Sequence, residues 1–309
     1  MGLNGGDSPG QEPSDPAGAS RGRLIPGTTT MVTAWSIPRD PSADTTLGDT
    51  PRGAQVRWGF RLFMNTGVEA PRYSKNALVC GNCHLNGGQR ELAMPLVGIA
   101  TVFPEYNNRA GRMITLEDRI VGCFNRSQNA TGARKSRKPE SPPHPSERDT
   151  PDPDAKEVVA LAAYIRWLSE GFAPGDSLPW RGHNVIPPDR RIPVARLSRT
   201  HGKALFLEKC SACHGRDGQG VPIGDKKAGP LWGPASWNDG AGAARVYTLA
   251  GMIRYSMPYL NPGSLTDEEA QQIAAFINSM PRPEFPHKDQ DYRVERLPAD
   301  AVYYEKTRR

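Results

Sequence analysis

Two short stretches of the sequence combine residue types that can hold a metal cofactor covalently. Each reads Cys-x-x-Cys-His, first over residues 80–84 and again over residues 210–214. In this arrangement both thiols can form thioether bonds with the vinyl groups of a haem, while the adjacent imidazole binds the iron. The two copies use four of the five cysteines and leave no even set for a disulfide framework. The sequence therefore predicts two covalently bound haem c groups, held by Cys80, Cys83, His84, Cys210, Cys213 and His214.

The alternative interpretation of each cysteine pair is a zinc site or a redox Cys-x-x-Cys motif. A zinc site needs further Cys or His residues at short spacing. The remaining histidines are His144, His183, His201 and His287. They are scattered along the chain without such spacing, so haem attachment is favoured over zinc.

A second ligand is expected on the opposite side of each iron. In the second half, Met257 stands before a proline in the long loop after the haem motif, and a methionine thioether raises the potential of a haem. We therefore expect Met257 as the distal ligand of the second haem. Met252 is the alternative, although a methionine at helical spacing more often belongs to a core.

The corresponding position in the first half holds Cys123, the one cysteine outside the motifs. Met94 follows His84 too closely to reach the opposite face of a haem. A lone cysteine is often a small buried hydrophobe. Here, however, arginines surround it in the sequence, and guanidinium groups favour the thiolate, the form that binds iron and attacks sulfur. These arginines, which could also hold a small oxyanion, are Arg109, Arg112, Arg119 and Arg126.

The elements that must position these residues occur twice. The pattern Gly59-x-x-Leu62-Phe63 before the first motif returns as Gly202-x-x-Leu205-Phe206 before the second. After the long loops, an Ala-aromatic-Ile triplet recurs inside two apolar-periodic helices, predicted over residues 156–169 and 267–280. The order of helix, haem motif, long loop and closing helix is thus an internal duplication.

Each repeat resembles the class I cytochrome c fold. In that fold, a glycine of the first helix lets the last helix cross closely, and an aromatic residue lies at the contact. Glycine suits such a crossing because it has no side chain to separate the two backbones. The second closing helix also has a clear start, where Thr266 and Glu269 can form a capping box.

The sequence thus predicts an all-α fold of two class I cytochrome c domains in tandem, with extended termini and a linker. Hydrophobic residues make up 37% of the chain, against 32 Gly and 30 Pro, so much of it is expected to be loop. The expected parts are a disordered leader (1–51), an N-terminal cytochrome c domain with haem 1 (52–175), a linker (176–197), a C-terminal cytochrome c domain with haem 2 (198–283) and an extended tail (284–309). A basic, proline-rich surface insertion is expected over residues 132–154.

The net charge of +6 does not indicate nucleic acid, because no recognition motif accompanies the basic residues. A cationic surface that attracts small anions or an acidic redox partner fits a haem protein better. No apolar stretch is long enough for a signal peptide or a membrane span. Because haem c is attached outside the cytoplasm as a rule, we expect a periplasmic protein whose export signal is not visible in this chain.

Residues 116–129, Leu-Glu-Asp-Arg-Ile-Val-Gly-Cys-Phe-Asn-Arg-Ser-Gln-Asn, resemble the signature of the dihaem thiosulfate dehydrogenases, and the dihaem layout over about residues 53–283 agrees. The resemblance implies an enzyme that joins two thiosulfates to tetrathionate, with the reverse reaction also open to it. Electrons would pass from haem 1 through haem 2 to a c-type cytochrome or another periplasmic acceptor.

The resemblance also implies roles for single residues. By position, Cys123 matches the distal ligand of the first, catalytic haem. Arg109, Arg119 and Ser127 match polar residues that line the substrate site. Ala130 departs from the glycine common in the family.

At the second haem, Ser256 stands before Met257 where some members carry a lysine that exchanges with the methionine on reduction. A ligand exchange of that kind is not expected here.

Three alternatives share parts of this pattern. A plain dihaem electron carrier predicts methionine on both irons and no arginine cluster. A haem subunit of a sulfur-oxidising complex also uses a cysteine-ligated haem, but transfers its substrate to a carrier protein. A dihaem peroxidase needs an open or His-ligated peroxide site, for which no motif is found.

Overall fold

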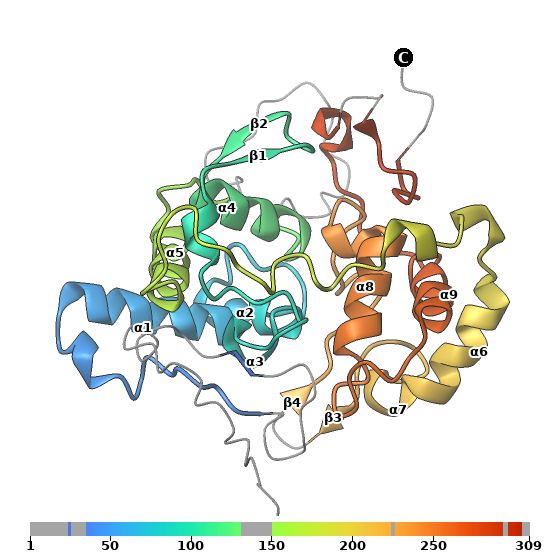
Figure 1. Ribbon diagram of the computed structural model, residues 1–309, viewed down its shortest axis with the longest axis horizontal. Helices are drawn as coiled ribbons and strands as arrows, with labels where there is room; N and C mark the ends of the chain where they lie inside the picture. The colour runs from blue at the N-terminus through green and yellow to red at the C-terminus, as the bar shows by residue number, and fades with distance from the viewer. Residues whose placement is uncertain (1–23, 26–34, 131–149, 224–225, 293–295, 305–309) are drawn as a thin grey trace, which may run out of the picture.

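The computed structural model describes residues 24–25, 35–130, 150–223, 226–292 and 296–304, and these residues are mostly helical. Figure 1 shows two groups of helices side by side. The first group contains α1 (Pro51–Met64), α2 (Thr66–Glu69), α3 (Leu85–Gly88), α4 (Leu116–Arg126) and α5 (Lys156–Leu168). The second group contains α6 (Arg199–Lys209), α7 (Ser211–His214), α8 (Val246–Ser256) and α9 (Asp267–Ile277).

The strands of the described residues form two small antiparallel hairpins. One pairs β1 (Glu105–Asn107) with β2 (Arg112–Ile114), and the other pairs β3 (Pro222–Ile223) with β4 (Lys226–Lys227). The predicted closing helices end slightly early, at Leu168 and Ile277. In the described part of the chain, no helix has the length and apolar character needed to cross a bilayer.

In both groups the first helix crosses the last at a glycine. A Cβ atom at Gly59 of α1 would stand 2.0 Å from the Ala160 carbonyl oxygen of α5. One at Gly202 of α6 would stand 2.0 Å from the Gln272 carbonyl oxygen of α9. Only a residue without a side chain permits this approach, and the crossing predicted from the repeated glycine is confirmed.

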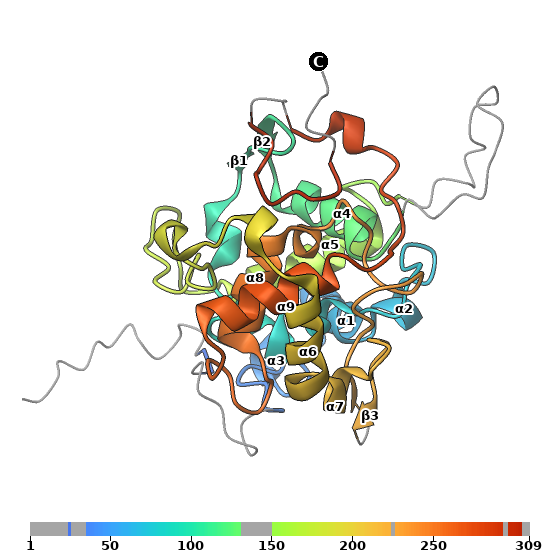
Figure 2. The same ribbon diagram turned by 90° about the vertical axis from the view of Figure 1, so that its right-hand side faces the viewer.

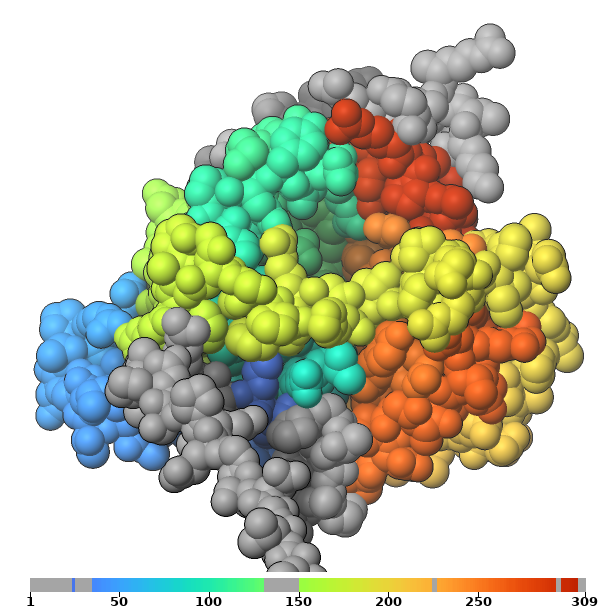
Figure 3. Space-filling view, viewed as in Figure 1, coloured from blue at the N-terminus to red at the C-terminus, as the bar shows by residue number. Residues whose placement is uncertain are grey.

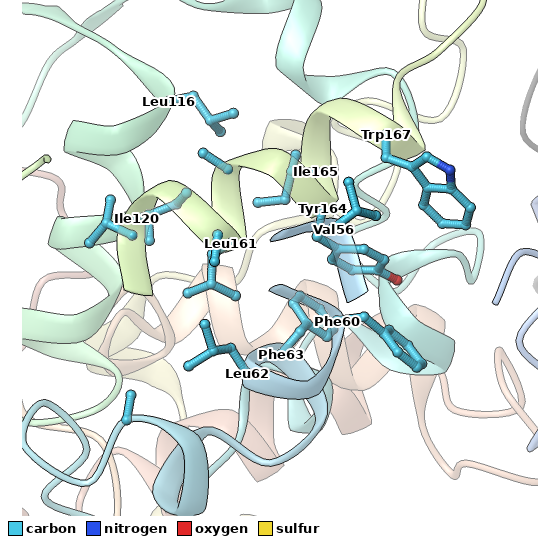
Figure 4. Packing of buried hydrophobic residues seen from close by; sticks show 14 of the residues in the cluster. Val56, Phe60, Leu62, Phe63, Leu116, Ile120, Leu161, Tyr164, Ile165 and Trp167 are labelled. Carbon is cyan, nitrogen blue, oxygen red and sulfur yellow. The ribbon is translucent and has the colours of Figure 1, made fainter. Parts of the chain in front are cut away.

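Aromatic rings fill each crossing. The ring centroids of Phe63 and Tyr164 are 5.5 Å apart, and those of Phe206 and Phe276 are also 5.5 Å apart. Figure 4 shows Phe60 and Phe63 of α1 facing Tyr164 of α5. Each crossing is the centre of its own hydrophobic cluster, and Figure 2 shows α6, α8 and α9 of the second group together.

The helices α9 and α4 each begin with a capping box. At α9, the Glu269 amide donates to Thr266 Oγ1 over 3.2 Å, and the Thr266 amide donates to Glu269 Oε2 over 2.8 Å. This confirms the predicted start of the closing helix. At α4, Thr115 and Asp118 form the same pair of bonds, which fixes the first turn of the helix that carries Cys123.

The leader is shorter than the sequence predicts. Residues 1–23 and 26–34 lie outside the described part, but residues 35–50 are placed against the first group. Leu47 is buried there, and Arg39 Nη1 donates to the Trp167 carbonyl over 2.9 Å. The prediction of disorder is therefore wrong for residues 35–50, because they bury an apolar side chain and bond to α5. Of the predicted surface insertion, residues 131–149 lie outside the described part.

The segment over residues 176–197 runs across both groups, as the yellow band in Figure 3 shows. Trp180 Nε1 donates to the Val97 carbonyl of the first half over 3.0 Å. The Ile192 amide donates to Gln271 Oε1 of α9 over 2.8 Å. The segment thus connects the two groups and also bonds to each.

The tail after α9 bonds to both halves. The Tyr292 amide donates to the Arg109 carbonyl of the first half over 2.9 Å, and the Tyr303 hydroxyl donates to the Met280 carbonyl, just after α9, over 3.1 Å. Phe285 is buried. The tail is extended, but it is packed between the groups.

Candidate active site

Three thiols lie close together in the first half. Cys80 opens a short turn after α2, and its Sγ lies 3.4 Å from Thr66 Oγ1. Burial raises the pKa of Cys80 to about 12 and that of Cys83 to about 11, and the charge of Cys123 adds to both shifts. Cys123 on α4 therefore lies near the motif, as a residue on the other side of a shared cofactor would.

His84 is held in the form that binds iron. Its Nδ1 lies 2.6 Å from the Met94 carbonyl oxygen, so Nδ1 carries the proton and Nε2 remains for a metal. Burial lowers the pKa of His84, the Met94 carbonyl opposes this, and the Arg119 guanidinium lowers it further. A neutral imidazole oriented by a carbonyl fits the proximal ligand of haem c.

Arg119 shares one face of α4 with Cys123, because the two residues are one helical turn apart. Its side chain is exposed, and among the described residues no ion pair of Arg119 is found. Figure 3 shows the surface hollowed between the β1–β2 hairpin, the tail and the yellow segment, and atoms in the green of α4 lie in that hollow. The exposed Arg119 side chain is therefore open to an anion from solvent.

The other arginines around Cys123 in the sequence point elsewhere. Arg112 pairs with Asp118 at the exposed start of α4. Arg126 Nη2 donates to Asp291 Oδ1 of the tail over 2.6 Å, and its guanidinium lies 4.4 Å from the centre of the Phe285 ring.

Arg109 is held by the second half. Its Nε donates to the Tyr292 hydroxyl over 3.1 Å, its Nη1 bonds to the Gly240 carbonyl, and its Nε lies 3.9 Å from Asp291. The structure thus brings Arg119 to the Cys123 face of α4 and turns Arg109 toward the tail.

Ser127 follows α4 directly. Its amide donates to the Cys123 carbonyl over 2.7 Å, and its own carbonyl accepts from Asn76 Nδ2 over 2.6 Å. Asn129 and Asn238 add bonds between this end of α4 and the second half. The helix end is therefore fixed at the boundary of the two groups.

Sequence reasoning missed the buried carboxylate of this region, Asp291. Its side chain is 4% exposed and accepts from Arg126 and from the Tyr304 hydroxyl. In the sequence, Asp291 looks like any other charged residue of the tail. Its partners come from distant segments, so no local pattern marks it.

The second motif begins with Cys210 at the end of α6, and its other four residues form α7. Burial raises the pKa of Cys210 to about 12. Burial lowers the pKa of His214, and the Gly229 carbonyl opposes that shift. Cys213 is exposed, so this edge of the motif faces solvent.

Gly229 also touches the first half. A Cβ atom there would stand 2.3 Å from Leu78 Cδ2 and 3.3 Å from Asn82 Oδ1, within the first motif. The two motifs are thus close neighbours across this glycine.

Met257 directly follows α8, and its amide donates to the Ile253 carbonyl over 3.1 Å. Met252 lies within α8 itself. The residues on both sides of Met257 bond to the first half: Ser256 Oγ donates to the Leu92 carbonyl, and the Tyr259 carbonyl accepts from Arg90.

Both halves match known cytochrome families. The family described as "SoxA/TsdA, cytochrome c domain" matches residues 69–173. The family described as "Cytochrome C oxidase, cbb3-type, subunit III" matches residues 198–277. Covalent haem c is therefore the cofactor that these residues fit.

Similar proteins share the name thiosulfate dehydrogenase. The one from Psychrobacter arcticus is 34% identical over 259 residues, which are 83% of this chain and 72% of that protein. The one from Allochromatium vinosum is 36% identical over 249 residues, which are 77% of this chain and 82% of that protein.

A solved thiosulfate dehydrogenase (TsdBA) from Marichromatium purpuratum superposes with a TM-score of 0.67 at 36% identity. The match covers 79% of this chain and 50% of that one, so the chain spans half the length of that solved protein.

Proposed function

Because the chain belongs to the thiosulfate dehydrogenase family, we propose that it joins two thiosulfate ions into tetrathionate. One sulfur–sulfur bond forms between the two sulfane sulfurs, and two electrons leave, so atoms and charge balance. The reverse reaction, in which tetrathionate takes up two electrons and gives two thiosulfate ions, would use the same residues and haems. When bound, two haem c groups supply the one-electron steps, with haem 1 beside Cys123, haem 2 at the second motif, and an external c-type cytochrome as the final acceptor.

The observation that carries this proposal is the placement of Cys123. It lies near Cys80 and Cys83, and it shares a helix face with the exposed Arg119. A plain electron carrier has no need of a free thiol and an arginine at one haem. A thiolate here can bind the iron or accept the sulfane sulfur of a substrate.

Arginine is needed because each thiosulfate carries two negative charges. Two such ions repel each other at contact distance, and a fixed guanidinium in a partly desolvated site offsets that repulsion. Arg119 is the first candidate for this task. Arg109 is the second candidate, although its Nε and Nη1 bond to Tyr292 and Gly240.

Ser127 supports the same site from the end of α4, with its hydroxyl as a further donor toward an oxyanion. At the second haem, His214 and Met257 are the proposed ligands, so this iron has the higher potential and draws electrons from the first. We also propose that the protein works in the periplasm, where haem c attachment and a cytochrome acceptor are both available. The two proposed domains cover residues 52–175 and 198–283, and residues 35–50 pack against the first of them.

The test is a reduction assay on the purified haem protein with thiosulfate as the only electron donor. We expect reduction of both haems and tetrathionate as the product. Haem reduction without tetrathionate would indicate an electron carrier, and a sulfur product bound to a second protein would indicate a subunit of a sulfur-oxidising complex.

A further inference from the structure

We propose that Arg90 is a positioning residue for Met257 and that residues 90–94 connect the ligands of the two haems. This inference rests on the proposed function, in which Met257 binds the iron of haem 2. Arg90 lies outside both motifs, in the loop that follows the first one. One short segment after α3 makes three contacts that support this role.

The first contact is made by Arg90 itself. Its side chain is fully buried, with an exposed fraction of 0%. Nη2 donates to the Tyr259 carbonyl over 2.9 Å, and the guanidinium lies 4.7 Å from the centre of the Tyr259 ring. Trp35 packs on the same ring, with centroids 5.0 Å apart. The loop just after Met257 is thus held from the first half.

The second contact lies just before Met257. Ser256, which is 1% exposed, donates its hydroxyl to the Leu92 carbonyl over 2.8 Å. Met257 therefore stands between two neighbours that both bond to the segment over residues 90–94. In Figure 3, teal atoms of the first half meet the orange atoms of the second half below the yellow band.

The third contact reaches the first haem site. The Met94 carbonyl lies 2.6 Å from His84 Nδ1. Leu92 and Met94 have φ values of 62° and 51°, in the left-handed region that residues other than glycine disfavour. Such a backbone persists only where its surroundings hold it, and here His84 and Ser256 are both bonded to it.

The consequence concerns haem 2. A thioether raises a haem potential only while its sulfur stays on the iron. A loop that loses its anchors on both sides of Met257 leaves that sulfur free to move away. Losing Arg90 should therefore weaken the bond between the methionine and the iron, whereas a contact that only stabilises the fold would leave that bond unchanged.

The experiment compares holoprotein variants Arg90→Met, Arg90→Lys and Ser256→Ala with the matched control Arg282→Met. Arg282 is half-buried, and like Arg90 it donates to a carbonyl, that of Ile277, and stacks on an aromatic ring, that of Trp237. Its contacts lie on the side of α9 and the tail. The readouts are the weak absorption band of methionine-bound ferric haem and the reduction potentials of both haems.

In Arg90→Met we expect loss of most of that band and a lower potential of haem 2. A tenfold shift of the electron equilibrium between the haems corresponds to about 59 mV for one electron. Arg90→Lys should restore part of the band, Ser256→Ala should change it in the same direction by less, and Arg282→Met should keep it.

An unchanged band and potential in both Arg90→Met and Ser256→Ala would overturn the inference, as would an equal loss in Arg282→Met. If Arg90→Met does not fold, Ser256→Ala and Arg90→Lys decide. The variant Met257→Ala separates this inference from its premise. If Met257→Ala retains the band, Met257 is not the ligand, and the positioning role of Arg90 is then wrong as well. If Met257→Ala loses the band but the Arg90 and Ser256 variants retain it, Met257 is the ligand and only the positioning role is wrong.

Discussion

Arg119 has the most direct access to an anion among the arginines around Cys123. Arg112 and Arg126 pair with carboxylates, and Arg109 is held by the tail. Of the arginines that surround Cys123 in the sequence, Arg119 is therefore the one exposed on the Cys123 face of α4, and the others bond to groups of the protein itself. The sequence could not separate them, because their partners are distant in the chain.

Replacing Arg119 with Gln should weaken thiosulfate turnover while both haems are retained. A hydrogen bond to a charged group is worth about 1.5–3 kcal/mol, which corresponds to a loss of about 10- to 150-fold in kcat/KM. Steady-state kinetics with thiosulfate measure the loss.

The matched control is Arg199→Gln, an exposed arginine at the start of α6. It removes the same charge far from Cys123 and should leave kcat/KM within about twofold, since a distant surface charge is screened by salt. Equal losses in the two variants would mean a diffuse electrostatic effect and no dedicated anion site.

At the scale of the helices, the crossing of the first and last helix could be predicted from the sequence. Gly59 and Gly202, with their following aromatic residues, are local signals that repeat in both halves. The capping box at Thr266 is also local. Helix ends, the packing of residues 35–50 and the direction of each arginine could not be predicted, because they depend on contacts between distant segments.

The variant Gly59→Ala should destabilise the first half. The added Cβ would meet the Ala160 carbonyl oxygen at 2.0 Å, so the two helices must separate. Overpacking of this kind costs about 1–3 kcal/mol. Denaturant unfolding followed by circular dichroism measures the change.

Gly67→Ala on α2 serves as the control, since only Ser74 Oγ, at 3.9 Å, lies near its added Cβ. There the substitution should be neutral or stabilising, by up to about 1 kcal/mol. A stable Gly59→Ala protein would show that the crossing is looser than described.

The start of α9 should make stability depend on pH. The backbone amide of Thr266 holds the pKa of Glu269 below its ordinary value of 4.5, and the Thr266 hydroxyl and Lys209 add to the shift. A carboxyl with a lowered folded-state pKa contributes stability above its unfolded pKa and loses it as the pH falls through the folded value. The capping box should therefore stabilise the helix at neutral pH and weaken below about pH 4.5.

Thr266→Ala should cost about 1 kcal/mol at neutral pH, and Glu269→Gln should reduce the loss of stability on acidification. Unfolding experiments across this pH range compare the variants with the wild type. The same acid-dependent loss in Glu269→Gln as in the wild type would assign the effect to other carboxyls.

For the whole molecule, the tail joins the two halves through a buried ionic cluster. Asp291 accepts from Arg126 and from Tyr304 over 2.6 Å each, and Arg109 lies 3.9 Å away. Removing one partner of a buried ion pair leaves an uncompensated charge. The sequence predicted an extended tail, but it gave no signal for this role because a single aspartate has no periodic pattern.

Asp291→Ala should therefore destabilise the protein by about 3–5 kcal/mol. Glu105→Gln is the control, because its pair with Arg181 is exposed, with 32% and 49% of the side chains accessible, and exposed pairs contribute about 0–1 kcal/mol. Thermal unfolding of both holoproteins gives the comparison. A loss in Asp291→Ala no larger than in Glu105→Gln would mean that the tail does not fasten the two halves.

The central claim is that Cys123 acts at the first haem in thiosulfate oxidation. In the proposed function both motifs use their cysteines for haem attachment, which leaves the Cys123 thiol to bind iron or accept sulfur. The variant Cys123→Met should fold with two covalent haems, since methionine is an ordinary haem ligand, and it should raise the potential of haem 1.

The most direct measurement is tetrathionate formation by Cys123→Met and wild-type holoprotein, with electron paramagnetic resonance of the oxidised forms. We expect a low-spin signal of thiolate-bound iron in the wild type alone, and loss of most tetrathionate formation in the variant. Turnover of thiosulfate by the variant at the wild-type rate would contradict the account and would leave a two-haem electron carrier as the better description.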